Sequence, residues 1–338
     1  MEAAEALAVV AVAAADVGVD REAIMKLHHI LLGSVVGIGL LMTPVTQVAT
    51  WAADEESFER FIGPEPESFA DPQAAIAAFK AKLAANDFDG TAKLLGLDPV
   101  AAATAENIKE NFEAIRQRAA KLFNVEEDGD QRILLLGDEV WPFPFPLRKL
   151  KDGKWSFDTI AGLEEVINRR VGENELEAIE TARAYIEAQR DYAMEDRDAD
   201  GVLEYAQKLV SSDAQTDGLY WPVEQGDGES PAGPFVSEQQ LRKAKEKGDG
   251  YFGYRFRILK GQGNNIAGGR YDYVINDNMI AGFGLIAWPV KYGETGVKTF
   301  AVNQAGIIYE KDLGPNTSAL VRDIARFNPD KSWEVVND

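Results

Sequence analysis

The sequence contains no cysteine and only two histidines, His28 and His29, in its 338 residues. Both histidines lie in residues 25–52, a segment with the pattern of a cleaved export signal, so we expect a mature chain with neither residue type. Such a chain excludes disulfides, Ser-His-Asp and Cys-His nucleophile systems, and zinc or haem sites built on His or Cys. Acid–base chemistry would fall to Asp, Glu, Lys or Tyr.

Long apolar runs are also scarce, and only residues 30–42 suggest a membrane. Lys26 precedes this run, and small and polar residues follow it as far as Ala52, which is the three-part pattern of a secretory signal. The run is too short for a membrane span, which needs about 20 residues. We therefore predict a signal peptide at 25–52, a periplasmic or secreted protein, and no membrane span after cleavage.

Residues 1–24 stand before Met25, the natural start of that signal. They are rich in Ala and Val and carry acidic residues ahead of the basic residue that an export signal has near its start. We interpret them as a spurious N-terminal extension from a mis-assigned start codon. The alternative is a genuine amphipathic helix ahead of an internal signal.

Positive charge is in short supply: 35 Lys and Arg face 56 Asp and Glu, giving a net charge of −21. A nucleic-acid-binding surface needs a basic footprint, so this balance excludes a nucleic-acid partner. It also disfavours anionic membrane surfaces. A strongly acidic surface suits solubility and the binding of cations.

The pattern of elements predicts an α+β fold of two domains after a linker at 53–70. In the first domain, 71–171, Asp71-Pro72 should start a helix that carries Phe79 on its buried face. A short helix around 91–95 and a longer one over 104–123 should follow. Strands are expected at 132–136, 143–150 and 155–159, with a hairpin turn at Asp152-Gly153. Helices followed by a curled antiparallel sheet resemble the nuclear-transport-factor-2-like (NTF2-like) fold.

Alternating prolines mark residues 141–146, with sequence WPFPFP. Proline cannot donate a hydrogen bond to a sheet, so the segment should form an edge strand or a polyproline-like ribbon. One interpretation is an exposed aromatic strip for a peptide or sugar. The other, which we favour, is a rigid edge whose aromatic rings fold back onto the core.

The second domain, 172–338, should begin after a helix break at Gly172. A long helix over 174–194 should bury a stripe that includes Leu176 and Gln189, and strands are expected at 254–259, 279–288, 297–302 and 307–309. A final helix is expected over 318–327. This half resembles the globular part of type IV pilins and pseudopilins. The resemblance is carried by residues 174–175, 188–192, 253–256, 287–290, 293–300 and 305–309.

The pilin resemblance has one important departure, because pilins begin with an apolar membrane helix that packs the filament core. Here a whole domain occupies that place. From about residue 69 to 333 the chain is similar to an uncharacterised exported bacterial family, domain-of-unknown-function family 2950. The marks of that similarity are residues 168–170, 191–192, 196–205, 218–222 and 310–315.

The strongest site signal is residues 196–204, with sequence DRDADGVLE. An EF-hand loop supplies calcium ligands at positions 1, 3 and 5, the carbonyl of 7, and 9, with Gly at 6 for the sharp turn. The predicted ligands are Asp196, Asp198, Asp200, the carbonyl of Val202, and Glu204. Gln207 replaces the bidentate Glu of position 12, which should weaken binding. The alternative is a solvated acidic turn.

These features favour an exported, non-catalytic interaction or structural module of the bacterial cell envelope, with a structural Ca²⁺ ion. The alternative function is a carboxylate-based hydrolase of cell-envelope glycan. Its candidate residues, Glu224, Asp227, Glu229 and Asp312, stand near aromatics or turns. A buried pair of carboxylates in a cleft would favour the enzyme, and aromatics on one flat face would favour the binding module.

Overall fold

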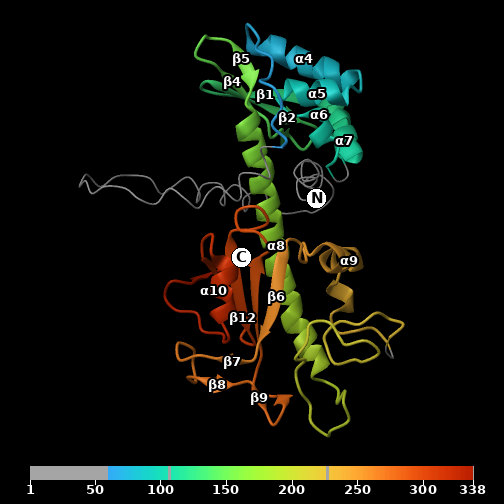
Figure 1. Cartoon of the computed structure of the whole chain (residues 1–338), viewed down its shortest axis with the longest axis vertical. Helices are drawn as coiled ribbons and strands as arrows, with labels where there is room; N and C mark the ends of the chain where they lie inside the picture. The colour runs from blue at the N-terminus through green and yellow to red at the C-terminus, as the bar shows by residue number, and fades with distance from the viewer. Residues whose placement is uncertain (1–59, 106–107, 226–227, 338) are drawn as a thin grey trace, which may run out of the picture. The chain divides into compact units, whose positions relative to one another are not determined.

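The computed structural model describes residues 60–105, 108–225 and 228–337 (Figure 1). The chain divides into two compact units, unit 1 up to Ile167 and unit 2 from Asn168. The predicted extension at 1–24, the signal peptide at 25–52 and the first part of the linker at 53–70 lie outside the described residues. Both units combine helices with antiparallel sheets, so the predicted α+β class is confirmed.

In its described part, unit 1 packs helices α4 to α7 against an antiparallel sheet with strand order β1-β2-β4-β5, and β3 pairs with β2. Its helices are α4 (Pro72–Ala84), α5 (Phe88–Leu94), α6 (Pro99–Ala102) and α7 (Ile108–Lys121). Its strands are β1 (Phe123–Asp128), β2 (Gln131–Leu136), β3 (Trp141–Pro142), β4 (Leu147–Lys149) and β5 (Trp155–Phe157).

Local sequence signals place several of these elements. Asp71 caps α4 by accepting a hydrogen bond from the Ala74 N–H at 2.8 Å, and Pro72 opens the helix. Gly153, at φ +86°, makes the turn between β4 and β5 as predicted. Phe79 is fully buried and its ring lies 4.9 Å from that of Phe143.

The aromatic rings of the WPFPFP segment are buried. Trp141, Phe143 and Phe145 all belong to the core of unit 1, and β3 pairs with β2 along its edge. The interpretation as an exposed aromatic strip is therefore wrong. The prolines restrict the backbone while the alternating rings fill the core.

Helix α8 (Thr159–Tyr192) is continuous, so the predicted break at Gly172 is wrong. Glycine inside a helix costs only about 1 kcal/mol relative to alanine, which packing elsewhere along the helix can offset. The boundary between the two units falls inside this helix, between Ile167 and Asn168. The predicted burial of Leu176 is also wrong, because its side chain is 44% exposed.

Unit 2 contains a five-stranded antiparallel sheet with order β14-β13-β12-β11-β6 and two small ribbons, β7-β8 and β9-β10. Its strands are β6 (Tyr254–Leu259), β7 (Gly261–Gln262), β8 (Tyr271–Asp272), β9 (Val274–Ile275), β10 (Asn278–Met279), β11 (Gly284–Pro289), β12 (Lys298–Asn303), β13 (Tyr309–Asp312) and β14 (Glu334–Val335). Its helical elements besides α8 are η1 (Gly233–Phe235), α9 (Glu238–Lys247) and α10 (Thr317–Asp323).

The two faces of this sheet bury different side chains. Leu285 and Phe300 pack with residues of α8, whereas Ile286 and Ala301 pack with α10 and the segment after it. This alternation follows the two-residue period of a strand. The core of unit 2 therefore has two parts, one on each side of the sheet, and Figure 1 shows α10 beside β12.

Polar side chains from α8 hold the loop that leads into β12. Asn174 donates to the Thr295 carbonyl at 2.9 Å, and one oxygen of Glu175 accepts from the backbone N–H groups of Val297 and Lys298 at 2.8 and 2.9 Å. These contacts tie together sequence segments that lie more than 100 residues apart.

No helix among the described residues combines the length and the apolar character needed to cross a membrane.

Candidate metal site

The acidic loop of residues 196–204 follows the end of α8, and Gln189 fixes its far end. The Gln189 side chain is fully buried and donates from Nε2 to the Ala206 carbonyl at 2.9 Å. In return, the Ala206 N–H donates to Gln189 Oε1 at 2.8 Å. These two hydrogen bonds join the C-terminal part of α8 to Ala206. The chain between them therefore forms a loop whose two ends are fixed.

Three aspartates converge in the closed loop. One carboxylate oxygen from each of Asp196, Asp198 and Asp200 lies within 4.8 Å of the other two, and all three side chains are exposed. The Gly201 N–H donates to Asp196 Oδ2 at 2.9 Å, and Gly201 has φ +88°, a conformation that favours glycine. The predicted role of this glycine in turning the loop is thus visible in its geometry.

The backbone of the loop is also held by its own side chains. The Val202 N–H donates to Asp200 Oδ1 at 2.8 Å, and the Asp200 N–H donates to Asp198 Oδ1 at 3.3 Å. These are Asx-type contacts, in which a carboxylate shapes a turn. They orient two of the three aspartates, and ligation by the Val202 carbonyl stays a prediction.

The predicted ligand Glu204 makes a contact outside the aspartate cluster. Its Oε2 accepts a hydrogen bond from the Met279 N–H in β10 at 2.9 Å. Position 9 of an EF-hand loop often reaches the ion through a water molecule, so a carboxylate held in this way is compatible with that role. Direct ligation by Glu204 stays a prediction.

The β9–β10 ribbon contributes a polar side chain that sequence reasoning missed. Asn278 Nδ2 donates to Asp200 Oδ2 at 2.7 Å, across 78 positions of sequence. The Tyr205 N–H donates to the Met279 carbonyl at 2.9 Å and fastens the same two segments. Local spacing carries no signal for a partner so distant along the chain, and only the folded sheet brings Asn278 to the loop.

The side chain of Gln207, at position 12 of the EF-hand pattern, makes its hydrogen bonds outside the aspartate cluster. Its Nε2 donates to the Asp277 carbonyl at 2.5 Å, and its Oε1 accepts from Lys260 Nζ at 2.8 Å. It holds the turn between β9 and β10.

Arg197 is the basic residue inside the acidic loop. Its described contacts are with groups other than the three aspartates. Its guanidinium lies 5.0 Å from the ring centre of Tyr192 and 5.4 Å from that of Trp221, and it pairs with Glu195 at 3.2 Å. Burial raises the pKa of Tyr192 to about 12, and the nearby Glu204 carboxylate adds to that increase. The indole of Trp221 is buried, so it belongs to the core of unit 2 rather than to a ligand platform.

Chemically, this arrangement suits a hard cation. Carboxylate, amide and backbone carbonyl oxygens are the ligands of Ca²⁺, and the aspartates present several of them in a small space. Asp196, Asp198 and Asp200 would hold the ion, and its charge would neutralise their mutual repulsion. The donor set contains no sulfur or imidazole, so it does not fit a zinc site of the usual kind.

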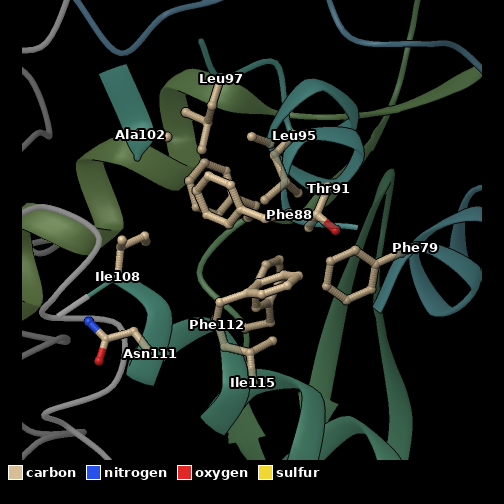
Figure 2. Close-up of a pocket in the computed structure, with 13 residues that line it drawn as sticks. Phe79, Phe88, Thr91, Leu95, Leu97, Ala102, Ile108, Asn111, Phe112 and Ile115 are labelled. Atoms are coloured by element: carbon tan, nitrogen blue, oxygen red, sulfur yellow. The ribbon is translucent and has the colours of Figure 1, made fainter. Parts of the chain in front are cut away.

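Carboxylates outside the loop do not form a cleft site in the described cavities. The cavity in unit 1 has a volume of about 30 Å³, and no carboxylate lines it. Figure 2 shows the rings of Phe79, Phe88 and Phe112 around it, with Asn111 at its margin. A second cavity, in unit 2, is lined by one carboxylate, that of Asp323.

The carboxylates predicted for a glycan hydrolase do not meet in either cavity. Asp312 accepts hydrogen bonds from the Tyr292 hydroxyl at 3.1 Å and from the Gly314 N–H at 2.7 Å, which are structural contacts. Neither Glu224 nor Glu229 lines either cavity, and Asp227 lies outside the described residues.

Two carboxyl groups on α8 have altered acidities that the sequence did not indicate. Burial raises the pKa of Glu173 to about 7, while the charge of Arg169 opposes that increase. Burial also raises the pKa of Glu175, although its hydrogen bonds from the start of β12 act in the other direction. Neither group lines either of the two cavities, and the hydrogen bonds of Glu175 belong to the packing of α8 against the loop before β12.

Comparison with known proteins assigns the chain to a family. The model of the family described as "Protein of unknown function (DUF2950)" matches residues 66–336, and the chain belongs to this family. No curated protein and no solved structure matches the chain. The NTF2-like and pilin-like resemblances therefore have no support from these comparisons.

Proposed function

We propose that this member of the DUF2950 family is an exported, non-catalytic interaction and structural module of the bacterial cell envelope, in which Ca²⁺ stabilises unit 2. The observation that carries the proposal is the convergence of Asp196, Asp198 and Asp200, whose oxygens lie within 4.8 Å of one another. The predicted export signal at 25–52 accompanies it in the sequence.

Electrostatics explains why the loop should need an ion. Two unit charges 4 Å apart interact by about 1 kcal/mol in water and by about 4 kcal/mol near a protein surface. Three such charges are held together by fixed loop ends, and their described contacts bring no cationic side chain among them. A divalent cation converts this repulsion into attraction in the folded state alone.

Calcium fits better than magnesium for geometric reasons. Calcium accepts a variable set of about six to eight oxygens, including water, whereas magnesium demands near-ideal octahedral geometry and dehydrates reluctantly. An exposed loop with three carboxylates and several carbonyls leaves room for water ligands. The lack of a bidentate carboxylate at Gln207 predicts weak binding, on the order of 10⁻⁴–10⁻³ M as in extracellular modules.

The envelope location and the pilin-like character of unit 2 belong to the same proposal. A long helix, α8, packs on one face of an antiparallel sheet, which is the order of elements expected of a pilin-like domain. Unit 1 occupies the place of the apolar polymerisation helix. We therefore propose an interaction module rather than a filament subunit.

The alternative, a carboxylate-based glycan hydrolase, needs two carboxylates facing each other across a cleft. The unit 1 cavity is lined by apolar side chains with Thr91 and Asn111, and the unit 2 cavity has the single carboxylate of Asp323. Neither of these two cavities is lined by a pair of carboxylates.

Thermal unfolding of the purified chain in EDTA and in millimolar calcium tests the proposal. At a calcium concentration ten times Kd, binding to the folded state adds about 1.4 kcal/mol and raises the Tm by roughly 3–6 °C. Asp198→Ala should abolish most of this shift, whereas Asp213→Ala, at an exposed aspartate outside the loop, should keep it. Equal Tm values in EDTA and calcium for the unaltered protein would identify an ordinary acidic turn.

A further inference from the structure

The side of the unit 2 sheet that carries α10 has a crevice with a volume of about 410 Å³. Its floor is apolar and comes from the sheet and the segment after α10: Leu259, Ala301 and Phe327 are all nearly fully buried. Ala301 contributes only a methyl group to this face, which leaves space above the sheet. The volume lies in the usual range of about 300–1,000 Å³ for small-molecule sites.

The walls of the crevice are held in place by hydrogen bonds. The Phe327 N–H donates to the Gly261 carbonyl at 2.9 Å, and its carbonyl accepts from the Gly263 N–H at 3.0 Å. Arg257 Nη2 donates to the carbonyls of Val321 and Ile324 at 2.6 and 2.7 Å. The crevice is therefore formed before any ligand arrives, which lowers the entropic cost of binding.

Three charged residues line the crevice, and they differ in their partners. Arg326 is used by the protein itself: it forms an ion pair with Asp272 and donates to the Tyr271 carbonyl at 3.0 Å. The side chains of Arg270 and Asp323, in contrast, form no hydrogen bond or ion pair within the described part of the chain, with each other or with a neighbour. Two opposite charges are thus left for a ligand beside an apolar floor.

We propose that this crevice binds a small zwitterion with an apolar side chain, such as a free amino acid or a short peptide. The ligand carboxylate would pair with Arg270, its ammonium group with Asp323, and its side chain would lie on the floor beside Trp333. Arginine is suited to carboxylates because its planar guanidinium offers two parallel donors. The site goes beyond the proposed calcium-stabilised module and is independent of the loop at 196–204.

Other ligand charges fit less well. A simple anion would meet Asp323 at the crevice and the field of a protein with a net charge of −21. A simple cation would meet Arg270. A neutral saccharide would complement neither unpaired charge, whereas a zwitterion complements both.

Isothermal titration of the full chain tests this proposal, with leucyl-leucine as the probe and calcium present throughout. The blocked analogue N-acetyl-leucyl-leucine amide, which lacks both charges, and N-acetylglucosamine are the comparison ligands. Leucyl-leucine should bind with a Kd at least roughly tenfold lower than either of them, since each charge-assisted contact is worth about a factor of ten. Arg270→Gln and Asp323→Asn should each weaken binding roughly tenfold.

Arg322→Gln is the matched control, because Arg322 is exposed next to Asp323 but does not line the crevice. It should bind leucyl-leucine as the unaltered protein does. Circular dichroism checks that the variants are folded, which is expected because both altered residues are exposed. The proposal is overturned if leucyl-leucine does not bind at millimolar concentration, if the blocked analogue or the sugar binds equally well, or if the crevice variants match the control.

Discussion

Replacing Gln189 by Leu removes the contact that closes the candidate metal loop. The side chain is fully buried and pairs with both backbone groups of Ala206, at 2.9 and 2.8 Å, and its Nε2 also donates to the Tyr185 hydroxyl at 3.0 Å. Leucine has a similar size but no polar atoms. The substitution therefore isolates the hydrogen bonds from the packing.

The expected loss of stability follows from the groups left unpaired. Ala206 is buried, so its N–H and carbonyl would each lose a partner without gaining water, at about 1–3 kcal/mol per group. Tyr185 keeps its own hydrogen bond to the Gly284 carbonyl at 3.0 Å. Burial of the apolar leucine side chain offsets part of this cost. We expect a net loss of about 2–4 kcal/mol in the free energy of unfolding and a Tm lower by roughly 5–15 °C.

The same change should weaken calcium binding. With its far end released, the loop must be ordered when the ion binds, and fixing one residue costs about 1–2 kcal/mol. A Kd for calcium roughly tenfold higher is expected. Urea unfolding in EDTA measures the stability, and calorimetric titration of the folded protein measures the affinity.

Gln239→Leu, at an exposed position of α9, is the control and should change neither quantity. An unfolding free energy for Gln189→Leu within about 0.5 kcal/mol of the parent would refute the stability argument, since that is the size of ordinary surface effects. A large loss of stability with an unchanged calcium Kd would refute the link between Gln189 and the loop.

Two further predictions concern pH and export. Burial raises the pKa of Glu173 in the folded state from 4.5 to about 7. Its contribution to the stability of the fold is therefore full below pH 4.5 and is lost as the pH rises through 7. Because the side chain is partly exposed, we expect this loss to be about 1–2 kcal/mol. Urea unfolding at pH 5 and pH 8 in EDTA should show this decrease for the parent and a smaller one for Glu173→Gln, and identical pH dependence would contradict it. Native protein from the extracytoplasmic fraction should have an N-terminus near Ala53; a mature product that retains residues 30–42, or a mainly cytoplasmic pool, would disprove the export prediction.

Sequence patterns were informative where the governing interactions are local. The Asp71 cap, the Gly153 turn and the spacing of aspartates at 196, 198 and 200 all depend on neighbours within a few positions, and the structure shows the corresponding contacts. The strand β6 (Tyr254–Leu259) has the predicted bounds, because its flanking turns and apolar alternation are equally local.

Errors arose where packing outweighs local preference. Gly172 should weaken a helix, yet α8 runs through it, because a helix gains most of its stability from tertiary contacts. Strand β1 (Phe123–Asp128) was missed because five of its six residues are exposed, so the apolar alternation that marks a strand is absent. Its pairing with β2 along all six positions is a long-range property of the sheet.

By itself, the sequence determined the absence of cysteine, the acidic character and the positions of the candidate ligands. Only the tertiary structure decided that Asn278 and Glu204 link the loop to the β9–β10 ribbon, and that Arg270 and Asp323 flank one crevice. Composition and local spacing act through residue chemistry and adjacent backbone geometry. Contacts across dozens of residues depend on how the strands register and pack, and no local pattern encodes them.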